Sequence, residues 1–157
     1  MAMGPVTYPD GGKTSSGESV RRVYYTGTAT LIKGGVLAYA TQATLAAFTK
    51  GPGVDVAISG GAVNELFAGI VADDSVGVTD PAWIKIIVPR GGDVVWCAVA
   101  AATDAGDGIL MAASQAFSDS GAYAAGDLGV ALMDEDAADN PYAAENLAPV
   151  LFASGVT

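Results

Sequence analysis

Short apolar segments, each ended after a few residues by glycine, aspartate or proline, recur along this sequence of 157 residues. Segments of four to eight such residues with turn residues between them are typical of the strands of a β-sandwich or β-barrel. We therefore predict an all-β fold, a compact small barrel of short strands. Nine strands are expected, at 22–28, 36–41, 54–58, 66–72, 83–88, 94–100, 108–111, 128–133 and 148–152. Only 42–49 shows the spacing of a helical turn or two.

Small residues dominate the composition, with 30 alanines and 21 glycines among the 157 residues. A chain of this length is expected to form one domain, and few bulky side chains are left to fill its core. Part of its stability is then expected to come from partner subunits. We assign 20–157 to a single all-β domain. Residues 1–19 are rich in glycine, serine and threonine without apolar periodicity, which predicts a flexible N-terminal arm.

Charge is unevenly distributed along the chain. Residues 1–90 contain seven basic and seven acidic side chains, whereas the segment after Arg90 has ten acidic side chains and no lysine or arginine. The net charge of −10 therefore arises entirely from the second part of the sequence. Such a segment repels nucleic acids and anionic membranes, so neither is expected as a partner. The longest uncharged stretch, at 34–49, is too short for a membrane span.

Several patterns that resemble catalytic or binding motifs are better explained as turns and loops. The sequence has no histidine, which excludes Ser-His-Asp triads and histidine-containing zinc sites. The segment 12–14 ends like a phosphate-binding loop but lacks its first glycine and a preceding strand. Asp119-Ser120-Gly121 has the form of an aspartic-protease motif, yet it is also a common turn sequence. The acidic run at 134–136 is interpreted as a solvated loop, and no catalytic residue, cofactor or metal is predicted.

The segment 83–99 contains both tryptophans and the single cysteine. If Gly91 and Gly92 form a two-residue turn, 83–88 and 94–99 pair as a hairpin with one wholly apolar face. Cys97 is then an inert core residue opposite Ile86. Trp83 and Trp96 share the other face, where they either contact a partner subunit or fill the core of this chain.

The order of several short motifs resembles that of tailed-phage capsid decoration proteins, also called cement proteins. The motifs are ATLIKGGVL at 29–37, FAGIV at 67–71, IVPRGGDV at 87–94 and LAPVLF at 147–152, and the similarity extends over about 20–153. The resemblance implies a β-barrel or β-tulip domain, usually trimeric, that binds the major capsid protein. Its location would be the exterior of the virion capsid, after assembly in the host cytoplasm, and its role would be to stabilise the mature shell.

Residues suited to an interface with the capsid or a neighbouring subunit lie at the start of the predicted domain. Arginine and tyrosine are enriched in interfaces, and Arg21, Arg22, Tyr24 and Tyr25 follow directly on the arm. The alternative is that they form an ordinary first strand. The second candidate function is a carbohydrate-binding or adhesin-like surface module, in which Tyr123 and Tyr142 stack on sugars. An aspartic protease is the third.

Overall fold

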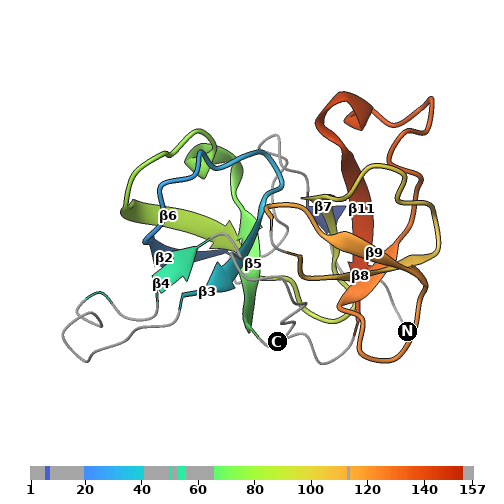
Figure 1. Ribbon diagram of the computed structural model, residues 1–157, viewed down its shortest axis with the longest axis horizontal. Helices are drawn as coiled ribbons and strands as arrows, with labels where there is room; N and C mark the ends of the chain where they lie inside the picture. Colours follow the sequence, from blue (N-terminus) through green and yellow to red (C-terminus); the bar gives the residue numbers. More distant parts are fainter. Residues whose placement is uncertain are drawn as a thin grey trace.

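The computed structural model shown in Figure 1 describes residues 6–7, 20–40, 50, 53–55, 66–112 and 114–153. It confirms the all-β class, because the regular structure of these residues consists of strands and two short 3₁₀ segments, η4 (Asp73–Ser75) and η5 (Ala143–Glu145). The strands form a closed barrel and a six-stranded sheet that lie side by side. Most of the predicted arm and the predicted helical turn at 42–49 lie outside the described residues.

Five strands form the barrel, in the order β2-β4-β3-β5-β6, and β6 closes it by pairing with β2. Neighbouring strands are antiparallel except β2 and β4, which are parallel. The strands are β2 (Val20–Tyr25), β3 (Val36–Tyr39), β4 (Gly53–Asp55), β5 (Phe67–Val71) and β6 (Ala82–Ile87).

The second sheet has the order β1-β7-β11-β10-β8-β9. Only β1 and β7 are parallel, so the part of the arm at 6–7 extends this sheet of its own chain. The strands are β1 (Val6–Thr7), β7 (Val94–Ala98), β8 (Asp107–Leu110), β9 (Ser118–Ala122), β10 (Gly129–Ala131) and β11 (Leu147–Phe152). Each of the nine predicted segments overlaps a strand, and β1 and β9 were not predicted.

Two apolar clusters explain why several barrel strands consist almost entirely of apolar residues. One cluster fills the barrel and includes Leu37 and Val71. The other lies between the barrel and the second sheet and includes Val36 and Ile70. Since neighbouring residues of a strand point to opposite faces, β3 and β5 are buried on both sides.

The cluster between the barrel and the second sheet draws on both of them. Ile87 at the end of β6 packs there with Val95 and Cys97 of β7, and three phenylalanines lie in or against it. The Phe67 ring is stacked on Phe152 with centroids 5.8 Å apart, and Phe117 contacts both rings. The described parts of the two sheets therefore share a continuous core.

The predicted hairpin between 83–88 and 94–99 is wrong. A turn does form at 90–93, where the Asp93 amide donates to the Arg90 carbonyl and Gly92 has φ 93°. However, β6 pairs with β2 and β5, whereas β7 pairs with β11 and β1. Pro89 just before the turn has no N–H for a hairpin ladder, and each strand finds two other partners. The turn thus carries the chain from the barrel into the second sheet.

Candidate functional site

The outer surface of the barrel at β2 and β6 concentrates exposed aromatic and basic side chains. In the antiparallel ladder Tyr24 lies opposite Trp83, and Arg22 lies opposite Lys85. Directly opposite residues share a face, so these four side chains point outward. The intervening residues Val23 and Ile84 face the barrel interior.

The two aromatic rings contact each other and are each approached by a cation. Tyr24 and Trp83 meet edge to face with centroids 5.5 Å apart. The Arg22 Cζ lies 5.4 Å from the centre of the Trp83 ring, and the Lys50 Nζ lies 4.1 Å from that of Tyr24. We call Arg22, Tyr24, Lys50 and Trp83 the aromatic–cationic face. Trp83 keeps 47% of its surface exposed, which is unusual for a side chain of this size.

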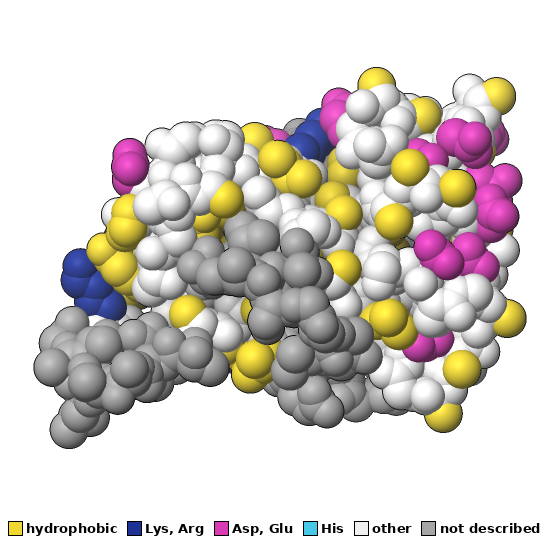
Figure 2. All heavy atoms as spheres, viewed as in Figure 1, with side chains coloured by type: hydrophobic (Ala, Val, Ile, Leu, Met, Phe, Trp, Pro, Cys, Tyr) yellow, Lys and Arg dark blue, Asp and Glu magenta, His cyan; other side chains and the backbone are white. Residues whose placement is uncertain are grey.

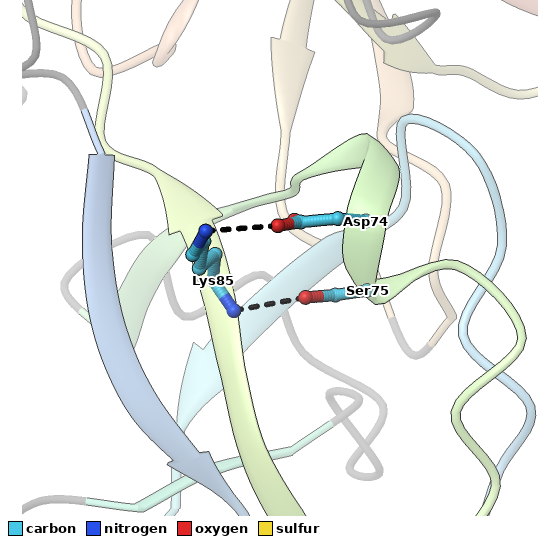
Figure 3. A network of polar contacts seen from close by, with 3 residues as sticks. All are labelled: Asp74, Ser75 and Lys85. Atoms are coloured by element: carbon cyan, nitrogen blue, oxygen red, sulfur yellow. Dashed lines mark hydrogen bonds and ion pairs between the residues drawn. The ribbon is translucent and has the colours of Figure 1, made fainter.

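Lys85 lies on the same side of the barrel but differs from Arg22 and Lys50 because its charge is paired. Its Nζ lies 3.0 Å from the Asp74 Oδ2, and both side chains are more than half exposed. The backbone N–H of Lys85 donates to the Ser75 hydroxyl at 2.9 Å (Figure 3). The segment η4 thereby supplies one partner to the Lys85 ammonium group and another to its backbone N–H.

The structure separates the six residues predicted for an interface. Arg22, Tyr24 and Trp83 meet on the aromatic–cationic face. Arg21 is exposed but lies on the other side of β2, opposite Ile86, and its Nη1 donates to the Tyr39 hydroxyl at 3.2 Å.

Tyr25 and Trp96 lie inside this chain instead. Tyr25 is fully buried in the barrel and donates its hydroxyl to the Ala29 carbonyl at 2.7 Å. Trp96 is 6% exposed and packs edge to face on Tyr142, with centroids 4.9 Å apart. The idea that the two tryptophans share a face is therefore wrong, because they belong to different sheets.

Lys50 was not identified from the sequence. It comes from a separate segment, and no local pattern links it to Tyr24. Only the parallel pairing of β2 with β4, in which Tyr24 lies opposite Gly53, brings this part of the chain to the aromatic–cationic face.

Cys97 is buried as predicted, although its neighbour across the ladder is Ala148 and not Ile86. Its Sγ lies 3.3 Å from the Val95 carbonyl oxygen. Burial raises the pKa of this thiol well above its ordinary value. The thiol therefore stays protonated at neutral pH, which makes it a poor nucleophile.

Acidic side chains gather over the second sheet, and the barrel lies at the other end of the molecule (Figure 1 and Figure 2). Repulsion by Asp134, followed by desolvation and by Asp107, raises the pKa of Asp104. The interpretation of 134–136 as a solvated loop fails for Glu135, which is 6% exposed and accepts the Ala102 N–H at 2.9 Å. Within the described residues no group of acidic or cysteine side chains is arranged to hold a metal ion.

The Asp119-Ser120-Gly121 motif lies on the edge strand β9. The Ser120 hydroxyl donates to the Asp127 Oδ2 at 2.9 Å, and Gly121 has φ 73° next to a shift in the β8–β9 register. The motif therefore links β9 to the turn at 124–127 that follows it. The segment 12–14 lies outside the described residues.

No protein-family model, curated protein or solved structure matches this chain at a significant level. Among the described residues, no helix is both long and apolar enough to cross a membrane.

Proposed function

We propose that this chain is a structural protein that binds the outside of a tailed-phage head through the major capsid protein and stabilises the mature shell. The observation that carries the proposal is the aromatic–cationic face, where an exposed tryptophan lies among cations that make no ion pair with a described carboxylate. Tryptophan, tyrosine and arginine dominate the binding energy of protein interfaces. The resemblance over about 20–153 supports a capsid as the partner and a trimer as the assembly.

Stabilisation follows from mass action. A protein that binds the expanded shell more tightly than the precursor or the ruptured shell lowers the free energy of the expanded state by the difference in binding free energy. This mechanism requires neither a catalytic residue nor a cofactor.

The charge distribution supports one orientation on the shell. Removing a dense group of carboxylates from water is costly unless the partner supplies matching cations. The aromatic–cationic face and the arm at 1–19 are therefore placed against the shell, and the acidic side of the second sheet faces solvent.

The test uses heads of the phage that encodes the chain, incubated with purified protein and imaged by electron cryomicroscopy. We expect density at three-fold and quasi-three-fold positions and a higher rupture temperature. Deletion of 1–19 should lower both the occupancy and the rupture temperature.

The matched control replaces Asp136 and Asp139 by asparagine, because both are exposed. Asp134 and Glu135 are unsuitable because they bond to the backbone. Undecorated heads would refute the function, whereas loss of binding by the Asp136 and Asp139 variant alone would reverse the orientation.

Carbohydrate binding is a second candidate because Tyr123 is 48% exposed. Tyr142 fits this role less well, since its ring contacts Trp96 and the Lys33 Nζ lies 4.6 Å from its centre. Glycan-array binding that is lost in Tyr123→Ala would support this candidate over the capsid.

A further inference from the structure

We propose that the aromatic–cationic face recognises an acidic, extended segment of its protein partner, one in which carboxylates are interspersed with apolar side chains. This inference rests on the proposed function, in which that segment belongs to the outer surface of the shell. It names the chemistry that the shell must present to the barrel.

The two cations of this face differ from Lys85 in the partners that the described residues provide. Arg22 and Lys50 approach aromatic rings and make no ion pair with a described carboxylate, in contrast to Lys85, which is paired with Asp74. A cation–π contact at an exposed site stabilises only weakly. Hydrogen bonds between a cation and a carboxylate are stronger than neutral ones, so carboxylates of a partner can recruit both side chains.

The aromatic pair supplies the apolar part of the recognition. Trp83 is 47% exposed and is held by Tyr24 on one side and Arg22 on another. Because its orientation is already set by these neighbours, little side-chain entropy is lost when a partner covers it. A partner side chain that covers Trp83 must be apolar, whereas its neighbours along the segment meet Arg22 and Lys50.

A peptide segment fits this face better than a nucleic acid or a sugar. A base or sugar ring that stacked on Trp83 or Tyr24 at the cation's position would displace Arg22 or Lys50. A long polyanion would also meet the net charge of −10. A short acidic segment carries few charges, and salt screens the distant carboxylates of the second sheet beyond about 8–10 Å.

The experiment measures fluorescence anisotropy of a fluorescein-labelled nine-residue peptide in which aspartate and glutamate alternate with leucine and phenylalanine. Its control is the same peptide with asparagine and glutamine in place of the acids. We expect the full-length protein to bind the acidic peptide at least about tenfold more tightly than the control, and 0.5 M NaCl to weaken binding.

Variants locate the site of binding. Arg22→Glu and Lys50→Glu should each weaken the acidic peptide about tenfold or more, and Trp83→Ala should do the same. The matched control is Lys85→Gln, on the same surface but already paired with Asp74, which should change affinity less than about threefold. In a Trp96→Phe background, the emission of Trp83 should shift when the acidic peptide binds.

The proposal is overturned if the two peptides bind alike, if neither binds, or if Lys85→Gln weakens binding as much as Arg22→Glu. Tighter binding of a nine-nucleotide oligothymidine would identify a nucleic-acid surface and also overturn it. Heads decorated normally by Arg22→Glu would leave the proposed function intact and refute this inference. If the peptide binds as expected but the heads stay undecorated, the proposed function is refuted. The aromatic–cationic face would then still be a binding site for acidic segments.

Discussion

A glycine followed by an aspartate closes three turns in the same way, at 90–93, 104–107 and 124–127. The glycine of each has φ between 93° and 100°. The aspartate N–H donates to the carbonyl of the first residue at 3.0–3.2 Å, and its carboxylate accepts the N–H of that residue at 2.8–3.0 Å. With Asp134 and Glu135, which also accept backbone N–H groups, five of the ten acids after Arg90 hold the backbone of turns and loops. Half of the acidic side chains after Arg90 therefore help to stabilise the fold.

Two residues with positive φ, one of them in the turn at 124–127, predict opposite effects of two reciprocal substitutions. Gly126 has φ 100°, and a Cβ added there would meet no atom within 4 Å, so Gly126→Ala should cost about 1–2 kcal/mol through the backbone alone. Ala102 has φ 68°, so Ala102→Gly should raise stability by about 0.5 kcal/mol despite the greater entropy of the unfolded chain. Urea unfolding measures both. Equal losses in the two variants would show that backbone strain is not the cause.

Among the elements, the start of β8 and the loop at 134–136 bring several carboxylates together. Repulsion from Asp134 is the largest cause of the raised pKa of Asp104. A carboxyl whose pKa is raised on folding destabilises the folded state when it is ionised. This penalty is present above the folded pKa and is relieved as pH falls through that value.

Asp104→Asn should therefore raise the melting temperature at pH 7, and the gain should vanish near pH 3.8, the ordinary pKa of the group. High salt should reduce the gain because Asp104 is exposed. Asp139→Asn is the control, since Asp139 is not among the residues that raise this pKa. Thermal scans across pH and salt would contradict the prediction if the gain persisted at low pH.

Gln115 joins the loop before β9 to the loop before β3. Its Oε1 accepts the Ile32 N–H at 3.0 Å, its Nε2 donates to the Thr30 carbonyl at 2.8 Å, and its backbone carbonyl accepts the Val36 N–H at 2.7 Å. The two side-chain bonds connect the barrel to the second sheet.

Gln115→Ala should therefore lower the free energy of unfolding by about 1–3 kcal/mol, because two backbone groups lose their partners. Ser114→Ala is the matched control, since the Ser114 hydroxyl bonds within its own loop, to Ala116, and to no other residue that the structure describes. Chemical denaturation compares the two variants. A larger loss for Ser114→Ala would show that the local loop matters more than the connection.

At the scale of the whole molecule, the shared core predicts that the two sheets unfold together. Val95 and Cys97 of one sheet are buried against Val36 and Ile70 of the other, so neither sheet can open without exposing the apolar surface of its neighbour.

The tryptophans report on the two sheets separately, because Trp83 lies on the barrel and Trp96 on the second sheet. In the single-tryptophan variants Trp96→Phe and Trp83→Phe, the urea midpoint from fluorescence should equal the midpoint from far-ultraviolet circular dichroism of the same variant. Different midpoints for the two signals would show that the sheets unfold independently.

The sequence by itself determined the all-β class and the position of nine strands. These properties follow from apolar segments and turn residues, which are local. It did not reveal β9, whose residues 118–122 are polar or small and whose strand forms because its backbone pairs with β8.

Only the tertiary structure decided which strands are neighbours. The turn at 90–93 is compatible with a hairpin, yet β6 and β7 enter different sheets because each pairs with strands distant in sequence. This choice buries Trp96, exposes Trp83 and brings Lys50 beside Tyr24. Strand pairing depends on the packing of the whole chain, so the composition of the candidate site followed from contacts that no local pattern contains.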